Sequence, residues 1–436
     1  MVNDGGLLIA RGLVHKNEQY KLNLEGPGIN NAHLIVVGES GSGKTTLLVK
    51  IINEMFYQGK TVFLIDFHGD MGISGENYIK YTPRNSPYGV NPFELEINAE
   101  TGGVKIQSEI ITSMLNQYFM DNGLGKKQRN ILRELIVDTY KSKGIYEDDM
   151  NTWTKEVPIM EDLGKLADYI RKVLNAEVNT NVGILKESIK NIKSYMPKES
   201  FEKTKESIEK IEEVVNDINI ENEKQLYGNI NLGYYLHSSV KRVFEGLYVY
   251  LEDIVKMTIF NGEKPRITKG VNRLDFSAFT QVNKPLIAKF LAEFTAQKLF
   301  RASMIRGQYS ELEGVTDGSK FDRILVFDES KLALPNGAEK NNSYNIFNRI
   351  CLESRKYGLA LFLASQRVEH YSEEILSNVF TKIILKVKAN DYKSVARALG
   401  LKEDFVADTF SITKERPAII DTNGSKHSYI IERFKD

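Results

Sequence analysis

The sequence predicts an α/β fold with a mostly parallel sheet, interrupted by a large α-helical insertion. The first observation is an apolar run at 33–37 that leads into glycines, an amphipathic stretch at 45–56 and a second apolar run at 61–67. Strand, glycine loop, helix and strand in this order are typical of a βαβ unit with parallel strands. The second is that helical patterns dominate 105–269, after which strand-like runs return.

The first half of the chain supports this division element by element. Residues 1–32 hold two strand-like stretches, Leu7–Ala10 and Tyr20–Leu24, before a Gly/Pro/Asn loop. We expect 33–104 to form the first part of the core and 105–269 the inserted domain. Apolar residues at helical spacing predict helices in the insertion, at Ile106–Tyr118, Gln128–Lys143, Met160–Asn175 and, as a helical hairpin, within Ile184–Glu223.

Residues 270–436 are expected to complete the core. One long helix is predicted at Pro285–Met304, and a hairpin is predicted around Asn423-Gly424, a pair that favours tight turns. Apolar runs predict the remaining strands at 271–276, 323–330, 359–365, 382–387, 418–422 and 428–434.

Length and composition narrow the function classes. A chain of 436 residues is expected to form two domains, or one domain with an insertion. Lys+Arg and Asp+Glu balance at 58 each, so any nucleic-acid contact requires a local basic surface, such as the pore of an oligomer. No apolar run approaches the roughly 20 residues of a membrane span, and a single cysteine, Cys351, fits a buried thiol in a reducing compartment. We therefore expect a cytoplasmic protein.

The segment GESGSGKT at 38–45 matches the pattern G-x-x-x-x-G-K-[ST]. Glycines let successive main-chain N–H groups point at phosphates, together with the start of the following helix. Lys44 is expected to reach the β- and γ-phosphates of ATP, and the Thr45 hydroxyl to ligate Mg²⁺. The predicted nucleotide-binding residues are Gly38, Glu39, Ser40, Gly41, Ser42, Gly43, Lys44, Thr45 and Thr46.

Two later segments supply candidate catalytic groups. The strand RILVF ends in Asp328 and Glu329, at the sheet edge where ligands bind in open α/β folds. Asp328 is expected to hold Mg²⁺ through its water shell, and Glu329 to activate the attacking water. Gln366 closes a strand, where its amide could contact the γ-phosphate or the water. Arg355 precedes that strand as either an arginine finger for a neighbouring subunit or a surface residue, and spacing alone does not decide.

Three further features allow weaker inferences. The segment DFHGD at 66–70 ends a strand and predicts a polar turn beside the phosphates rather than a separate metal site. A loop at 336–342 could line a channel. A basic cluster could contact DNA or simply begin a solvated helix: Lys126, Lys127 and Arg129.

Taken together, these motifs resemble the FtsK–HerA superfamily of ring ATPases, with HerA-like translocases and conjugative type IV secretion ATPases most similar. The resemblance covers nearly the whole chain. YGVNPFELE (88–96) resembles the family's "NP-hydrophobic" signature, and NTWTKEVPIMEDL (151–163) is similar to part of the conjugative insertion. The other segments follow in the family's order: GESGSGKT, DFHGD, VNRLDFSAF, FDES, RKYGLALFLASQR and LSNVFTKIILKV.

The resemblance implies a RecA-like core, a hexameric ring and ATP-driven translocation of DNA or, in some secretion members, export of protein. Phe67, Ser330 and Lys386 stand where relatives often have Pro, Ala and Arg, so no second finger is expected from the last of these. Neither a HerA-type β-barrel nor an FtsK-type winged helix is expected. The implied roles are phosphate and Mg²⁺ binding for Lys44 and Thr45, a Walker B pair for Asp328 and Glu329, a sensor for Gln366 and a trans-acting finger for Arg355.

Three functions stay open from the sequence. The first is a homo-oligomeric ring motor that translocates DNA. The second is a peripheral conjugation or type IV secretion ATPase that acts with membrane partners. The third is a nucleotide-gated ring scaffold for a partner nuclease or effector.

Overall fold

The computed structural model describes residues 6–12, 19–26, 28–100, 102–119, 123–178, 227–309, 320–342, 345–412, 415–422 and 425–431. The chain divides into two compact units. Unit 1 comprises Met1–Tyr88 and Lys264–Asp436, and unit 2 comprises Gly89–Glu263. Unit 2 begins before the expected insertion because Gly89 N donates to Glu263 O at 2.9 Å, which joins the two ends of the unit.

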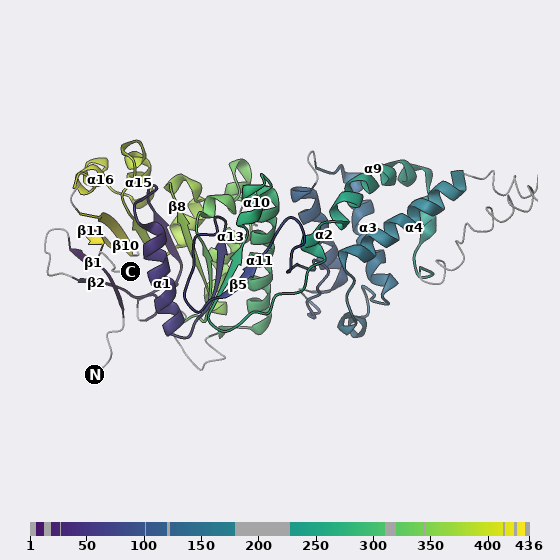
Figure 1. The fold of residues 1–436 in the computed structure, drawn as a ribbon, viewed down its shortest axis with the longest axis horizontal. Coiled ribbons are helices and arrows are strands. Elements are labelled where there is room, and N and C mark those ends of the chain that lie inside the picture. The colour runs from purple at the N-terminus through teal and green to yellow at the C-terminus, as the bar shows by residue number, and fades with distance from the viewer. Residues whose placement is uncertain are drawn as a thin grey trace, which may run out of the picture. The chain divides into compact units, whose positions relative to one another are not determined.

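Unit 1 is built on one eleven-stranded sheet, in the order β2-β1-β11-β10-β9-β3-β8-β7-β4-β6-β5 (Figure 1). The strands from β9 to β5 are mutually parallel, and the remaining strands pair antiparallel. This arrangement confirms the predicted α/β class with a mostly parallel sheet. The parallel strands are β3 (Leu34–Val37), β4 (Thr61–Asp66), β5 (Asn77–Lys80), β6 (Val271–Asp275), β7 (Arg323–Phe327), β8 (Leu359–Ser365) and β9 (Thr381–Ile384).

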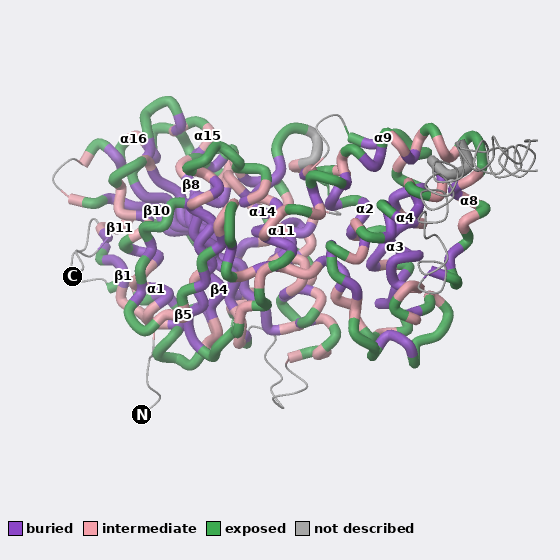
Figure 2. Tube along the Cα trace, turned by 45° about the vertical axis from the view of Figure 1, so that its right-hand side comes forward, coloured by how far each residue is buried: buried purple, intermediate pink, exposed green. Residues whose placement is uncertain are grey.

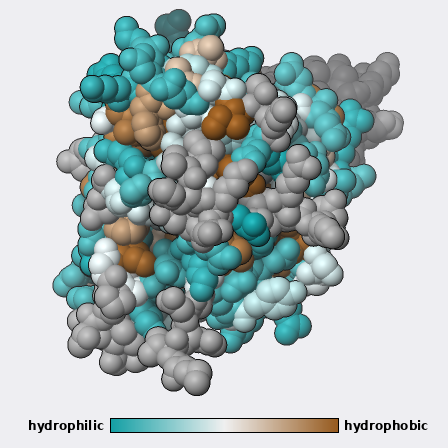
Figure 3. All heavy atoms as spheres, turned by 90° about the vertical axis from the view of Figure 1, so that its left-hand side faces the viewer, coloured by the Kyte–Doolittle hydropathy of each residue, from teal (hydrophilic) through white to brown (hydrophobic). Residues whose placement is uncertain are grey.

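The antiparallel side of the sheet pairs β1, from the start of the described residues, with β11, from their end. The predicted C-terminal hairpin is confirmed, with Thr422 opposite Ser425. The strands on this side are β1 (Leu7–Gly12), β2 (Gln19–Leu22), β10 (Pro417–Thr422) and β11 (Ser425–Ile431). In Figure 3, which faces this end of unit 1, apolar residues lie in separate groups among hydrophilic ones over the described surface.

Helices cover the sheet because their apolar faces pack against its fully buried strands. All residues of β3 and β8 are buried (Figure 2). Helix α1 (Lys44–Tyr57) places Leu48, Ile52 and Met55 in the same core, at the spacing predicted for an amphipathic helix. The other α-helices within the described residues of unit 1 are α10 (Ser277–Gln281), α11 (Pro285–Arg306), α13 (Ile346–Glu353), α14 (Glu373–Asn378), α15 (Tyr392–Leu399) and α16 (Glu403–Phe410).

Unit 2 is helical over its described residues. Helices α2 (Gly103–Tyr118), α3 (Lys126–Ser142) and α4 (Met160–Val178) confirm three predicted helices, and α8 (Leu232–Leu236) and α9 (Ser238–Val255) follow. The helical hairpin predicted within Ile184–Glu223 lies outside the described residues. Within the described part of the chain, no helix combines the length and apolar character that crossing a membrane requires.

Candidate functional site

The glycine loop (38–45) leaves β3 at the edge where the parallel strands end, which we call the carboxyl edge. Its main chain is fixed on both sides: Gly38 N donates at 3.2 Å to O of Ser365, the last residue of β8, and Glu39 N donates at 2.8 Å to O of Lys386, just after β9. Gly43 has φ +94°, a conformation that side-chain-bearing residues rarely adopt. The loop therefore depends on glycine at the position just before α1.

Lys44 begins α1 and folds back over the loop. Its Nζ donates to Gly38 O at 2.8 Å and to Glu39 O at 3.1 Å, and the residue is only 8% exposed. Burial lowers the pKa of Lys44, while the carboxylates of Glu329 and Asp328 act in the opposite direction. A buried ammonium held by main-chain carbonyls is placed to bind an anion that enters the loop.

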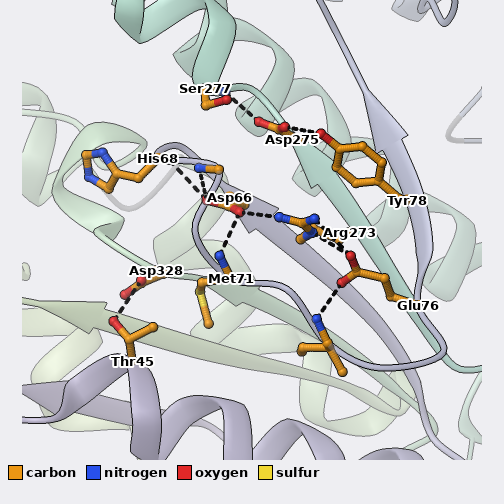
Figure 4. Close-up of polar contacts among 12 residues, drawn as sticks. Thr45, Asp66, His68, Met71, Glu76, Tyr78, Arg273, Asp275, Ser277 and Asp328 are labelled. Atoms are coloured by element: carbon orange, nitrogen blue, oxygen red, sulfur yellow. Dashed lines mark hydrogen bonds and ion pairs between the residues drawn. The ribbon is translucent and has the colours of Figure 1, made fainter.

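Thr45 meets Asp328 at the carboxyl edge, although the two residues are 283 positions apart. Thr45 Oγ1 donates to Asp328 Oδ2 at 3.2 Å (Figure 4). Burial raises the pKa of Asp328, and Coulombic repulsion from Glu329 and Asp70 adds to this shift. A hydroxyl and a buried carboxylate are the oxygen ligands that Mg²⁺ prefers, and a divalent cation would offset the cost of burying the charge. The donor set thus fits a magnesium site.

The carboxylate of Glu329 is held by two neighbouring side chains. Its Oε1 accepts a hydrogen bond from Gln366 Nε2 at 3.2 Å and lies 3.0 Å from Lys331 Nζ. The residue has φ 56°, in the left-handed region that is uncommon for residues other than glycine. The structure brings together Glu329 and Gln366, two of the predicted catalytic residues, and their roles stay predictions. Lys331 was missed, because no sequence signal shows that the chain turns so sharply at Glu329.

The segment DFHGD forms a tight turn around the carboxylate of Asp66. The two carboxylate oxygens accept hydrogen bonds from the main-chain N–H groups of His68 at 3.0 Å, Gly69 at 2.7 Å and Met71 at 3.2 Å (Figure 4). Asp70, in the same turn, contributes to the raised pKa of Asp328, which forms an acid pair with Glu329 at the end of β7. Asp66 is therefore an anchor for the turn.

A partly buried arginine on the neighbouring strand β6, Arg273, supports the same turn. Arg273 Nη1 donates to Asp66 Oδ2 at 3.1 Å, and Arg273 Nη2 lies 2.9 Å from Glu76 Oε1. Its guanidinium also stacks over the ring of Tyr78, at 4.5 Å from the centroid. The sequence did not indicate this role, because it depends on β6 lying beside β4 in the sheet.

Arg355 lies away from the glycine loop of its own chain. It belongs to a 3₁₀ turn, Ser354–Tyr357, directly before β8, whereas Gln366 follows the end of that strand. Because β8 is parallel to β3, the side chain starts from the edge opposite the loop. The structure therefore does not bring Arg355 to the other predicted catalytic residues, and its role as an arginine finger stays a prediction.

The remaining predicted features take ordinary positions. Cys351 is buried in α13, and burial raises the pKa of its thiol, as expected for a structural cysteine. The basic cluster of Lys126, Lys127 and Arg129 is exposed in the first turn of α3. Contact between this cluster and DNA stays a prediction.

Comparisons with known proteins extend these observations. The model of the family described as "Helicase HerA, central domain" matches residues 9–249. The DNA double-strand break repair helicase HerA of Pyrococcus furiosus is 28% identical over 169 residues, which cover 34% of this chain and 30% of that protein. Its namesake from Sulfolobus acidocaldarius is 22% identical over 404 residues, or 92% of this chain and 64% of the relative. The chain thus matches less than two thirds of the length of either relative.

Two solved structures are similar over nearly the whole chain. VirB4 of Thermoanaerobacter pseudethanolicus aligns with a TM-score of 0.66 at 14% identity, covering 100% of this chain and 98% of that one. The bacterial conjugative coupling protein TrwB, in complex with sulphate, aligns with a TM-score of 0.55 at 11% identity, covering 99% and 94%. At these identities the similarity shows the shared fold.

Proposed function

This chain belongs to the HerA central-domain family, and we propose that it is a P-loop ATPase that binds Mg·ATP in the glycine loop and hydrolyses it. One observation carries the proposal. Thr45 and Asp328, from segments 283 positions apart, meet at 3.2 Å beside Lys44 and Glu329. A phosphate loop and an acid pair at one sheet edge are the parts that phosphoryl transfer to water requires.

Binding is assigned to residues 38–46. Main-chain N–H groups of the loop and the start of α1 face the phosphates, and Lys44 exchanges its carbonyl partners for phosphate oxygens. Thr45 and Asp328 would hold Mg²⁺, which neutralises charge on the phosphates when bound. These residues give the site its preference for a nucleoside triphosphate.

Hydrolysis is assigned to side chains that lie opposite the glycine loop at the carboxyl edge. Glu329 takes a proton from the attacking water, and Gln366, which contacts it at 3.2 Å, orients the carboxylate or the water. Arg355 acts on the nucleotide of a neighbouring subunit, where a cation stabilises transition-state charge. This last role requires a homo-oligomer, and we propose a hexameric ring.

The substrate of the motor is proposed to be DNA. The curated relatives are named as DNA double-strand break repair helicases, and the alignment with one of them covers 92% of this chain. The balanced net charge means that contacts with DNA come from a local surface. Secretion and scaffold functions are the competing outcomes of the test.

ATP turnover with and without double-stranded DNA tests the proposal. We expect DNA to stimulate turnover, and the stimulation to fall steeply between about 50 and 200 mM salt as counterion release weakens binding. If DNA does not change the turnover rate, the proposed DNA motor is refuted, but the proposed ATPase activity is not. Sedimentation analysis with Mg·ATP should show the hexamer, and a monomer at all concentrations would contradict the ring.

A further inference from the structure

The C-terminal hairpin reaches the glycine loop because of strand order. Strand β9 is parallel to β3 and ends at the carboxyl edge. Strand β10 is antiparallel to β9, with Ile419 opposite Ile384, so β10 begins where β9 ends. Arg416, the residue directly before β10, therefore starts from the carboxyl edge.

The side chain of Arg416 lies against the last glycine of the loop. A Cβ atom built on Gly43 would lie 3.4 Å from Arg416 Nη1, which is ordinary van der Waals contact. Arg416 is exposed, and among the described residues its guanidinium has no hydrogen bond or ion pair. A cation that has no acidic partner within the described part of the chain thus stands beside the loop that is expected to hold phosphates.

The main chain of Arg416 is fixed to the neighbouring strand. Ile431 N donates to Arg416 O at 2.8 Å, which ties the residue to β11. The following Pro417 restricts the backbone of Arg416 to extended conformations. The hairpin therefore holds the Cα of Arg416 in place while the guanidinium is available for a ligand.

We propose that Arg416 is a nucleotide-binding residue that contacts the α- or β-phosphate of the nucleotide in its own chain. The proposal rests on the proposed function. In loops of this type, main-chain amides contact the α- and β-phosphates, whereas the lysine contacts the β- and γ-phosphates. Gly43 directly precedes Lys44, so a side chain beside Gly43 lies near the α- and β-phosphates. Arginine presents planar paired donors that match phosphate oxygens. This role differs from that of Arg355, which starts from the opposite edge of the sheet.

The full-length Arg416→Ala variant tests the assignment, with fluorescent ATP, ADP and AMP analogues as probes. We expect ATP and ADP each to bind about five- to tenfold more weakly, the value of a charged hydrogen bond reduced by solvent exposure. AMP, which carries the α-phosphate alone, should also bind more weakly if Arg416 contacts the α-phosphate, and should bind as in the parent if Arg416 contacts the β-phosphate. Arg416→Lys should restore part of the loss and Arg416→Gln little of it.

Lys426→Ala is the matched control. It removes one cation from the same hairpin but at the other end, where Asp421 is opposite Lys426 and the strands turn. We expect parental nucleotide affinity in the control and an unchanged melting temperature of nucleotide-free Arg416→Ala. Equal losses in both variants, or a lowered melting temperature of Arg416→Ala that accounts for the weaker binding, would overturn the assignment.

Other outcomes separate this assignment from the proposed function. A parent chain that binds no nucleotide refutes both. A parent that binds ADP, together with Arg416→Ala that binds it equally well and Lys44→Ala that does not, refutes the Arg416 contact alone. A loss confined to ATP would contradict the α- or β-phosphate position.

Discussion

The two sides of the carboxyl edge are built differently. The glycine loop is held by its main chain, with bonds to the ends of β8 and β9, and even Lys44 is retained by two carbonyl oxygens. Glu329, across the edge, has a strained main-chain conformation and is held by Lys331 and Gln366. Under the proposed function, nucleotide binding would therefore use a preformed frame, whereas hydrolysis would require side chains that change partners. Substitutions should accordingly separate affinity from turnover.

Glu329→Gln should show the largest difference between its effect on turnover and its effect on nucleotide affinity. The amide keeps the shape of the side chain but cannot accept a proton from water, so kcat should fall about 10²- to 10⁴-fold. Nucleotide affinity should stay close to that of the parent, because the loop is untouched. Single-turnover phosphate release and nucleotide titration measure the two quantities. Unreduced turnover in Glu329→Gln would refute its role as the base.

Arg355→Ala should reduce turnover about 10²-fold in the assembled ring, the usual effect of one lost group that stabilises transition-state charge. Nucleotide affinity of the single chain should not change, because Arg355 lies at the other edge of the sheet. Steady-state ATPase assays at concentrations that maintain the oligomer provide the measurement.

Mixing variants gives the control for action between subunits. A ring formed from Arg355→Ala and Lys44→Ala chains contains junctions where an intact arginine faces an intact glycine loop. Mixed rings should regain part of the activity that each variant lacks alone. If they stay inactive although mixed assembly is demonstrated, Arg355 does not act across the interface.

Lys331→Met should have the smallest effect and the opposite sign. Lys331 is 37% exposed and its partner Glu329 10% exposed, so the ion pair restrains the base by only a modest free energy. We expect basal turnover without DNA to rise about two- to fivefold. Lys256→Met is the control, because it breaks an exposed ion pair with Glu252, also at 3.0 Å, in unit 2. A fall in turnover for Lys331→Met would show that Lys331 assists the reaction.

Local patterns predicted most of the fold and the centre of the site. The strand, glycine loop and helix around Lys44, and the acid pair after an apolar strand, follow from periodicity and motif spacing. Strand β5 was missed because its four residues, Asn77–Lys80, alternate in burial over too short a run to show a pattern.

Contacts that depend on strand order could not be read from the sequence. Arg273 reaches Asp66 only because β6 lies beside β4, and Arg416 reaches the loop only because β10 returns antiparallel to β9. Lys331 contacts Glu329 because the main chain of Glu329 adopts a left-handed conformation, which its residue type does not predict. These long-range contacts set the surroundings of the site, whereas the motifs set its centre.

The affinity of Lys44→Ala for ATP tests the central claim most directly. The account requires that triphosphate binds within the glycine loop, so removal of the ammonium should weaken ATP binding about tenfold or more. Calorimetric titration of parent and variant, each with a melting curve to show folding, gives the comparison. If a folded Lys44→Ala chain binds ATP as tightly as the parent, the nucleotide does not occupy this loop.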